Sequence, residues 1–351
     1  MVDRRGGDVL SEPVRVGLIG TGLMARYHLT TMVGRPDTVI AGICEPSADA
    51  YAAAAVTIEA AGAAVPPNEP DWQRFLSTTA RELDLDAVMI VTPHAQHFAQ
   101  ATAALEAGLD VYLEKPMVLD ATEAVALIAT RDRTGRLLVV GFNGSLSPQV
   151  RAASAMLRRG ELGAILNIDA LVWQDWRTHS TGTWRQDPAI SGGGFLFDTG
   201  AHMLNTVSDL AGEGVSQVAA WLEDDGSPVD IRGVVMARLP SGGLITMNGC
   251  GRAIPSLGSD IRVFCERGSL RTGIWGERLE LQRHGAATMR RVRSVRSTSV
   301  WEQFLDVRRG AIPNPSPPEV GLRMARLWDA IRESSSRGGA VVFPKLEEVA
   351  A

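Results

Sequence analysis

Short apolar runs alternate with helix-like segments over the first 142 residues of the chain. The runs at 14–19, 38–45, 87–91, 110–113 and 137–142 are mostly apolar, so each predicts a strand buried on both faces. Segments between these runs predict helices at 24–34, 47–62, 71–77, 94–107 and 120–133. This alternation predicts an α/β Rossmann domain, a doubly wound parallel sheet covered by helices, over residues 14–142.

From about residue 143 the pattern changes to longer segments with partial alternation of apolar and polar positions. Strands are predicted at 165–174, 215–223, 229–239, 244–250, 260–265 and 340–343, and helices at 149–159 and 195–210. The glycine turn at 241–243 is typical of a hairpin, and the proline-rich stretch 313–318 separates two late helices. We expect an α+β domain for substrate binding and oligomerisation over 143–351, with a large, mostly antiparallel, open-faced sheet. Packing of the last helix on the first domain is an open alternative.

Composition narrows the class of protein. The chain has 351 residues, enough for two domains, and its net charge of −5 argues against nucleic acid as a partner. No apolar run is long enough to span a membrane, and residues 1–13 lack a signal-peptide core, so we expect a disordered tail there. Cys44, Cys250 and Cys265 are odd in number and widely spread, which fits neither disulfides nor zinc. A cytoplasmic protein is the natural interpretation.

The first strand runs directly into the turn Gly20-Thr21-Gly22-Leu23-Met24-Ala25, which has the G-x-G-x-x-A spacing of a dinucleotide-binding loop. Gly20 permits the tight turn, and Gly22 leaves no side chain between the backbone and a pyrophosphate. The N-terminus of the following helix attracts the phosphates. A glycine-rich turn that binds no ligand remains the alternative.

Polar side chains follow the strands that the sheet topology brings to one edge. Glu45 lies 25 residues after Gly20 (45 minus 20), near the spacing of an acid that binds the adenosine ribose. Its charge would repel a 2′-phosphate, so NAD is favoured over NADP, although a solvated surface glutamate is the alternative. The predicted cofactor contacts, which converge on the ligand crevice, are Gly20, Thr21, Gly22, Leu23, Met24, Glu45, Thr92, His94, His97, Glu114 and Lys115.

Three residues are candidates for the chemistry. Lys115 follows a strand next to Pro116, where an ammonium can hold a developing alkoxide. Asp198 and His202 are four residues apart, on one face of the predicted helix, and the imidazole is suited to accept a hydroxyl proton. A capping aspartate and a packed histidine would explain the same spacing without catalysis.

A metal site is a weaker alternative for the same region. His94 and His97 are three residues apart and, with Asp198 and His202, would supply enough ligands. Because distant segments would have to meet with ligand precision, we predict no metal. Aromatic rings and guanidinium groups crowd one segment, and the predicted substrate contacts there are Trp173, Arg177, Trp184 and Arg185.

The order of these motifs resembles the glucose–fructose oxidoreductase/inositol dehydrogenase (Gfo/Idh/MocA) family from residue 14 to about residue 332. The motifs are GTGLMA at 20–25, DAVMIVTPHAQH at 86–97, EKP at 114–116 and GTWRQDPAISGGGFLFDTGAH at 182–202. The resemblance implies a Rossmann domain followed by an open-faced sheet domain, NAD(P)-dependent oxidation or reduction of a sugar or cyclitol, and sheet-to-sheet oligomers. It also implies that Lys115, Asp198 and His202 act at the substrate.

This chain departs from the family pattern at three places. His94 stands where many relatives have asparagine, and Glu45 stands where aspartate is more usual. Residues 143–146 read Asn-Gly-Ser-Leu instead of an arginine–aromatic pair, although Asn143 is still expected at the nicotinamide pocket as a substrate contact.

The functional hypothesis is an NAD-dependent oxidoreductase that transfers a hydride between nicotinamide and a ring carbinol or ketone of a sugar, amino sugar or cyclitol. His202 would be the base, Lys115 would stabilise the alkoxide, and Asp198 would orient His202. Two alternatives stay open: a glycosidase of the same fold that retains its NAD, and a non-enzymatic NAD-binding regulatory protein. A homodimer or homotetramer formed through the open sheet face is expected.

Overall fold

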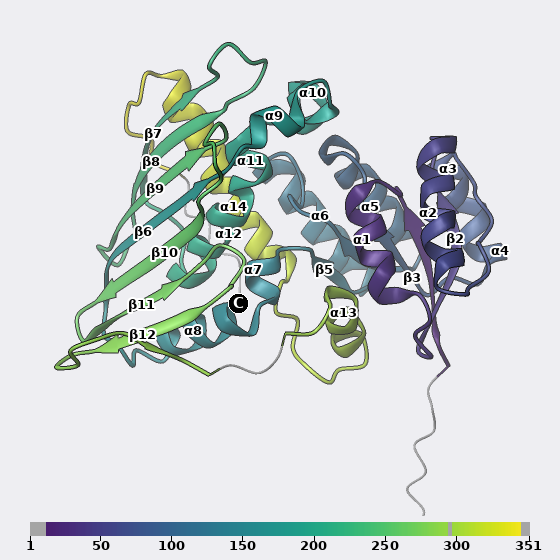
Figure 1. Cartoon of the computed structure of the whole chain (residues 1–351), viewed down its shortest axis with the longest axis horizontal. Helices are drawn as coiled ribbons and strands as arrows, with labels where there is room; N and C mark the ends of the chain where they lie inside the picture. The colour runs from purple at the N-terminus through teal and green to yellow at the C-terminus, as the bar shows by residue number, and fades with distance from the viewer. Residues whose placement is uncertain (1–11, 294–296, 345–351) are drawn as a thin grey trace, which may run out of the picture.

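The computed structural model describes residues 12–293 and 297–344, and two sheets organise it (Figure 1). One sheet has five parallel strands in the order β2-β1-β3-β4-β5, and the other has eight strands in the order β13-β12-β11-β10-β6-β9-β8-β7. In the second sheet every pairing is antiparallel except that between β6 and β9. The predicted fold class is therefore confirmed. The tail predicted at 1–13 lies outside the described residues, apart from Glu12 and Pro13.

The first sheet is built as the apolar runs predict. Its strands are buried between helices on both faces, and their carboxyl ends meet at one edge. The elements are β1 (Val14–Ile19), α1 (Leu23–Met32), β2 (Thr38–Cys44), α2 (Ala48–Ala60), α3 (Trp72–Arg74), a π-helical turn (Phe75–Thr79), α4 (Ala80–Glu82), β3 (Ala87–Ile90), a 3₁₀ turn (His94–Gln96), α5 (His97–Glu106), β4 (Asp110–Leu113), α6 (Ala121–Thr134) and β5 (Leu138–Val140).

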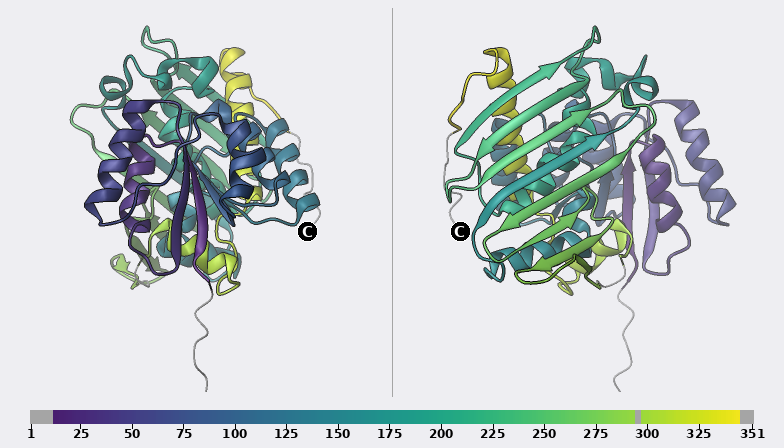
Figure 2. Two further views of the ribbon diagram at one scale, coloured as in Figure 1. Left: turned by 90° about the vertical axis from the view of Figure 1, so that its right-hand side faces the viewer. Right: turned by 60° about the vertical axis from the view of Figure 1, so that its left-hand side comes forward.

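The second sheet carries helices on one face only. Its elements are α7 (Asn143–Leu146), α8 (Pro148–Arg158), β6 (Ile165–Trp173), α9 (Trp176–Ser180), a 3₁₀ turn (Trp184–Gln186), α10 (Pro188–Ser191), α11 (Phe195–Asp198), α12 (Gly200–Ala211), β7 (Gln217–Glu223), β8 (Arg232–Arg238), β9 (Leu244–Cys250), β10 (Gly258–Cys265), β11 (Gly268–Thr272), β12 (Leu279–Arg283), β13 (Arg290–Arg291), α13 (Val300–Arg308) and α14 (Pro318–Ser336). The right-hand view of Figure 2 shows the other face without a covering helix.

Several elements differ from the sequence prediction. The sheet continues beyond Cys265 into β11, β12 and β13, whose short and mainly polar segments carry no strand pattern. The helix predicted at 195–210 is divided at Thr199 into α11 and α12. The last predicted strand, 340–343, forms only one isolated bridge, between Val342 and Val218.

Late segments of the chain pack on the first domain. Trp301 and Phe304 of α13 are fully buried in the same apolar cluster as β1 and β2. The indole Nε1 of Trp301 donates a hydrogen bond to Thr38 Oγ1 at 2.8 Å. The backbone N–H of Val140 in β5 donates to the carbonyl of Ser316 at 3.0 Å. The core of the first domain is thus completed by residues beyond position 300.

Asp230 fixes the segment that leads into α11. Its partly buried carboxylate accepts hydrogen bonds from the backbone N–H groups of Gly194, at 2.6 Å, and Leu196, at 2.9 Å. A Cβ placed on Gly194 would lie 1.9 Å from the carbonyl oxygen of Asp230, so only glycine permits this approach.

We therefore expect Gly194→Ala to destabilise the fold by at least about 2 kcal/mol, because the new methyl group meets backbone atoms that cannot rotate away. Thermal unfolding would measure the loss. Gly22→Ala is the matched control, since a Cβ there meets nothing within 4 Å, and its melting temperature should stay near that of the wild type. Equal melting temperatures for all three proteins would contradict the argument.

Candidate active site

A cavity of about 390 Å³ lies at the carboxyl edge of the parallel sheet, between the two domains. The first domain contributes the glycine turn and the ends of β2, β3 and β4, and the second contributes Trp184, Arg185 and Asp198. Of the predicted cofactor contacts, Gly20, Gly22, Leu23, Met24, Glu45, Thr92, His94, Glu114 and Lys115 line this cavity. The position agrees with the general rule that open parallel sheets bind ligands at this edge.

The glycine turn has the shape that a dinucleotide requires. Gly20 has φ +89°, and a Cβ on it would lie 2.5 Å from the carbonyl oxygen of Val91. Above Gly22 a Cβ would meet nothing within 4 Å, so the backbone is open to a ligand. Helix α1 begins at the next residue, and no side chain caps its N-terminus. The turn therefore fits the pyrophosphate of NAD.

Glu45 lines the cavity and is also hydrogen-bonded to the glycine turn. Its Oε2 accepts hydrogen bonds from the backbone N–H of Thr21, at 2.7 Å, and from its hydroxyl, at 3.0 Å. Its Oε1 accepts one from the backbone N–H of Ser47 at 2.9 Å. A carboxylate has about four acceptor positions, so one is left for a ribose hydroxyl. Thr21 is fully buried and its N–H faces Glu45, not the cavity.

The two histidines after β3 have different surroundings. His97 is fully buried, and its ring nitrogens contact the carbonyl oxygens of Pro116, at 2.7 Å, and Thr92, at 2.9 Å. These contacts turn His97 away from the cavity. The ring instead connects the segments that follow β3 and β4. This is not the cofactor contact that the sequence predicts.

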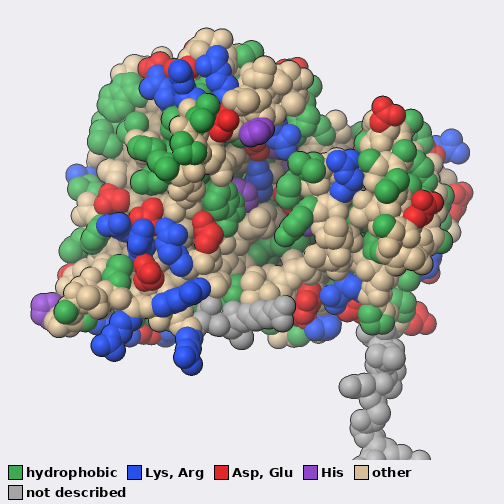
Figure 3. All heavy atoms as spheres, in the orientation of Figure 1, with side chains coloured by type: hydrophobic (Ala, Val, Ile, Leu, Met, Phe, Trp, Pro, Cys, Tyr) green, Lys and Arg blue, Asp and Glu red, His purple; other side chains and the backbone are tan. Residues whose placement is uncertain are grey.

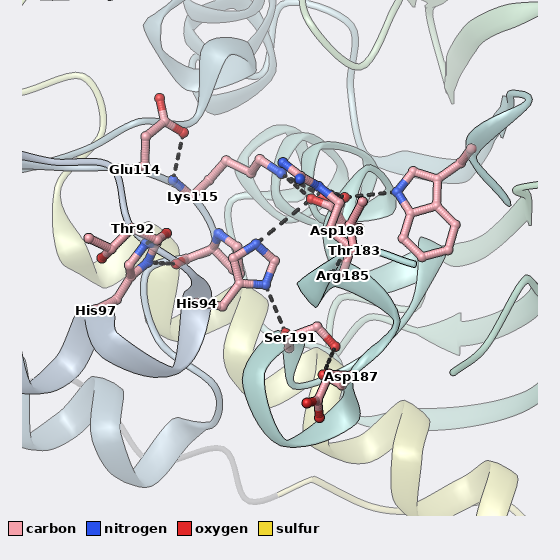
Figure 4. A network of polar contacts seen from close by, with 12 residues as sticks. Thr92, His94, His97, Glu114, Lys115, Thr183, Arg185, Asp187, Ser191 and Asp198 are labelled. Carbon is pink, nitrogen blue, oxygen red and sulfur yellow. Dashed lines mark hydrogen bonds and ion pairs between the residues drawn. The ribbon is translucent and has the colours of Figure 1, made fainter. Parts of the chain in front are cut away.

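His94 lines the cavity. Its Nδ1 lies 2.8 Å from the carbonyl oxygen of Ser191, and a carbonyl only accepts, so this nitrogen must carry the proton. In the neutral ring Nε2 is then an acceptor, and it lies 3.8 Å from Asp198 Oδ1 (Figure 4). Two acceptors facing each other leave a position for a donor, such as a hydroxyl group of a ligand.

Asp198 is the centre of the polar network in Figure 4. Its Oδ1 accepts a hydrogen bond from Lys115 Nζ at 2.8 Å. Its Oδ2 accepts from Trp176 Nε1 at 2.8 Å and from Arg185 Nε at 3.0 Å. Lys115 Nζ also donates to the backbone carbonyl of Asp198 at 2.9 Å. The ion pair between Lys115 and Asp198 therefore connects the end of β4 to the end of α11, across the domain boundary.

Burial and charge set the protonation states of this network. Burial alone would raise the pKa of Asp198, but the positive charges of Lys115 and Arg185 lower it far below its usual range. Burial lowers the pKa of His94 to about 3, against the opposing effect of Asp198. Burial, assisted by the charge of Lys115, also lowers the pKa of His202 to about 3. At neutral pH both imidazoles are therefore neutral.

His202 lies beside this network but not in the Asp198 hydrogen-bond set. The hydrogen-bonded helix is interrupted at Thr199, although this residue keeps helical dihedrals (φ −73°, ψ −41°). The Asp198 carboxylate is occupied by Lys115, Trp176 and Arg185. Among the described residues, Asp198 makes no hydrogen bond to His202, and His202 Nδ1 is buried without a partner. The His202 ring packs edge-on to Phe142, with centroids 6.5 Å apart, and near Trp275, at 5.9 Å. The expectation that Asp198 orients His202 is therefore wrong in this geometry.

The predicted substrate contacts are divided between two places. Trp184 and Arg185 line the cavity, and the guanidinium carbon of Arg185 lies 4.6 Å from the centre of the Trp184 ring. Arg177 of α9 is not among the residues that line it. Trp173 is at the far end of β6, where its Nε1 donates to Asn248 Oδ1 at 2.8 Å and its ring borders hollows of the open sheet face. Asn143 begins α7 and lines a separate cavity of about 610 Å³.

Two contacts of the site were not foreseen from the sequence. His28 of α1 forms a buried hydrogen bond with Glu114, with Nε2 2.7 Å from Oε1. Burial would raise the pKa of Glu114, but His28 lowers it. Trp275, between β11 and β12, contacts His202. Neither residue belongs to a motif, so no sequence signal marks them. In the part of the chain that the structure describes, no group of three or more His, Cys, Asp or Glu residues is arranged to hold a metal ion.

Both domains of the chain match models of one protein family. Residues 14–142 match the model of the Gfo/Idh/MocA oxidoreductase family, NAD-binding Rossmann fold, and residues 150–271 match a C-terminal domain of the same family. The chain thus has the domains of an oxidoreductase whose first domain binds NAD. It belongs to the Gfo/Idh/MocA family, and the resemblance and the cofactor predicted from the sequence are confirmed.

Curated relatives are similar over part of their length. Levoglucosan dehydrogenase of Pseudarthrobacter phenanthrenivorans is 28% identical over 207 residues, which cover 58% of this chain and 52% of that protein. Inositol 2-dehydrogenase 4 of Saccharopolyspora erythraea is 28% identical over 211 residues, which cover 60% of this chain and 57% of that protein. The chain thus spans a little over half the length of these relatives.

Solved structures resemble the whole described fold. Levoglucosan dehydrogenase in complex with NADH and levoglucosan has a TM-score of 0.80 at 23% identity, over 96% of this chain and 100% of that chain. An inositol dehydrogenase homolog from Azotobacter vinelandii, complexed with NAD⁺, has a TM-score of 0.82 at 20% identity, over 98% and 100% of the two chains. At these identities the likeness establishes the fold. Over the described residues, no helix of this chain has the length and apolar character needed to cross a bilayer.

The depressed pKa of His94 predicts a pH dependence of stability. Below pH 6.5 the unfolded chain binds a proton at this imidazole, whereas the folded chain does not. The free energy of unfolding is therefore highest above pH 6.5 and decreases as pH falls towards about 3. We expect His94 to account for about 1.5–2 kcal/mol of the loss between pH 6.5 and 5.

The measurement is urea unfolding at both pH values for the wild type and for His94→Asn, whose amide can still donate to the carbonyl of Ser191. The variant should lose less stability between the two pH values. Parallel loss in both proteins would show that His94 is not the group that titrates.

Proposed function

We propose that this protein is an NAD-dependent oxidoreductase that acts on a CH–OH group of a sugar, amino sugar or cyclitol. The observation that carries the proposal is the Lys115–Asp198 ion pair in the same cavity as an open dinucleotide turn. The names of the relatives, levoglucosan dehydrogenase and inositol 2-dehydrogenase, support this substrate class.

The residues that would hold NAD belong to the first domain. Gly20 and Gly22 leave space for the pyrophosphate, and Glu45 has an acceptor position for the adenosine ribose. The carboxylate would repel a 2′-phosphate, which favours NAD over NADP. Thr92 and His94 border the path from the turn to Lys115. When bound, NAD supplies the hydride acceptor or donor.

The other steps fall to residues of this chain. Lys115 is held by Asp198 and would donate a hydrogen bond to the substrate oxygen, stabilising negative charge on it as the carbonyl forms. His202 is neutral, and the charges of Lys115 and Asp198 both affect its pKa. Its imidazole would accept the hydroxyl proton of the substrate. Asp198 acts by fixing Lys115 and Arg185 and does not orient His202.

Two alternative functions, an NAD-retaining glycosidase and a non-enzymatic regulatory protein, can be distinguished from a dehydrogenase by experiment. An NAD-retaining glycosidase would cleave a glycoside without net formation of NADH, whereas a dehydrogenase accumulates NADH with a free polyol. A regulatory protein would bind NAD and oxidise nothing. A neutral imidazole near a partly buried lysine, next to a dinucleotide site, favours the dehydrogenase.

We expect Lys115→Met to lower kcat about 10²–10³-fold, because one donor to the developing oxyanion is removed. The dissociation constant of NAD should change less than about threefold. Steady-state rates of NADH formation and fluorescence titration of NADH measure the two effects.

The reciprocal control is Gly22→Ala, whose methyl group enters the space for the pyrophosphate. This variant should bind NAD more weakly and keep kcat at saturating NAD. If Lys115→Met weakened NAD binding as much as it slowed turnover, the role assigned to Lys115 would be wrong.

The open face of the large sheet supports an oligomer. Alternate residues of its strands point outward, and several of them are large, apolar and exposed: Trp221, Val234, Met236, Leu244 and Phe264. Contiguous apolar surface of this kind is typical of protein–protein contacts. We propose that a second copy of the chain packs on this face.

Met236→Glu should therefore shift the protein towards monomer, because it would bury a charge in the interface. Light scattering coupled to gel filtration measures the mass. Val56→Glu is the control, since Val56 is an exposed apolar residue of α2, away from the sheet. A wild type that is monomeric, or a Met236→Glu protein of unchanged mass, would rule out this interface.

A further inference from the structure

The wall of the cofactor cavity includes a loop, residues 66–72, to which the proposed function gives no role. Pro70 and Trp72 of this loop line the cavity together with Glu45. Figure 3 shows the surface hollowed between the two domains, and the loop belongs to the first of them. Because Glu45 is the proposed ribose contact, a group that fixes Glu45 also affects how the adenosine half of NAD is held.

The loop extends the parallel sheet by a short stretch beside β2, which stands at the edge of the sheet. The backbone N–H of Ile43 donates a hydrogen bond to the carbonyl of Pro67 at 2.9 Å. The backbone N–H of Glu69 donates to the carbonyl of Ile43, also at 2.9 Å. In a parallel pair the backbone groups on one side of a strand recur every second residue, so the next pair on this side belongs to Glu45.

Asn68 supplies the partners of that next pair with its side chain. Its Oδ1 accepts a hydrogen bond from the backbone N–H of Glu45 at 3.0 Å. Its Nδ2 donates to the backbone carbonyl of Glu45, also at 3.0 Å. The loop backbone itself forms only one bridge to β2, between Asn68 and Ile43, so the amide continues the ladder beyond it. Both backbone polar groups of Glu45 are thereby fixed, and with them the direction of its side chain.

The loop is anchored on both sides of Asn68. The hydroxyl of Tyr51 in α2 donates a hydrogen bond to the carbonyl of Pro66 at 2.8 Å. After Asn68, the carboxylate of Glu69 pairs with the guanidinium of Arg74, with Oε2 3.1 Å from Nε. The amide of Asn68 therefore projects from a backbone that is itself held in place.

The carboxylate of Glu45 depends on this fixed direction. Thr21 donates two hydrogen bonds to it and Ser47 donates one, which leaves one of about four acceptor positions for a ribose hydroxyl. A rotation of the backbone at Glu45 would move that position away from the ribose. It would also move the negative charge that repels a 2′-phosphate.

We propose that Asn68 is a positioning residue for Glu45 and thereby sets the preference of the site for NAD over NADP. Asn68 is not among the residues that line the cavity, so it acts on the cofactor only through Glu45. The proposal rests on the ribose contact that the proposed function assigns to Glu45, and it does not depend on which sugar or cyclitol is the substrate.

Fluorescence titration of the full chain with NADH and with NADPH tests the proposal without any sugar. Asn68→Ala should raise the Kd of NADH about fivefold, because the ribose hydrogen bond is misplaced. It should raise the Kd of NADPH less, because a displaced carboxylate repels the 2′-phosphate less, so the ratio of the NADPH Kd to the NADH Kd falls. Asn68→Ser, whose hydroxyl is too short to serve both backbone groups, should shift the ratio in the same direction and replaces the alanine variant if that one does not fold.

A double-mutant cycle identifies the route of the effect. In the Glu45→Ala background, Asn68→Ala should leave the ratio unchanged, because no carboxylate remains to be positioned. Asn314→Ala is the matched control, since the Asn314 side chain also joins two backbone groups, those of Leu138 and Ser316, at the opposite edge of the parallel sheet. This control should lower the melting temperature and keep the ratio of the wild type.

The possible outcomes separate this proposal from the ribose contact on which it rests. A ratio that falls in Glu45→Ala but not in Asn68→Ala would overturn the role of Asn68 and keep the ribose contact. An unchanged ratio in Glu45→Ala would contradict the ribose contact and, with it, this proposal. A fall that persists in the Glu45→Ala background, or that also occurs in Asn314→Ala, would show that Asn68 does not act through Glu45 and would overturn the proposal.

Discussion

The ion pair between Lys115 and Asp198 is the interaction on which the rest of the site depends. Each charge is largely removed from water and comes from a different domain, so the loss of either would leave the other buried without compensation. The pair holds the two walls of the cofactor cavity at a fixed distance. It also keeps the ammonium near His202, whose neutral state follows from burial beside that positive charge.

The remaining architecture positions these two residues. Lys115 follows β4. His97 contacts the carbonyl of the next residue, Pro116, and the carbonyl of Thr92 after β3. Asp198 ends α11, and Asp230 holds the backbone just before that helix. The site is thus supported by buried polar groups with fixed partners, an arrangement that limits its freedom before any ligand arrives.

The sequence predicts well what depends on local pattern. Apolar runs gave the parallel sheet, and the glycine spacing gave the turn, because strand burial and backbone space are properties of neighbouring residues. Side-chain direction is different. The four-residue spacing of Asp198 and His202 suggests that they are partners, but side chains from other segments occupy the Asp198 carboxylate. His97 in turn points to the carbonyls of Pro116 and Thr92. Trp275 reaches the site only through the three-dimensional path of a loop, which no spacing encodes.

The packing of α13 has a consequence for biosynthesis. Trp301 fills the core of the first domain and bonds to Thr38, 263 positions earlier in the chain. A nascent chain that has just finished its fifth parallel strand therefore has an open apolar gap where this indole belongs. Independent folding of an N-terminal domain during translation, which is common in proteins of several domains, is incomplete here until the ribosome has almost reached the last helix.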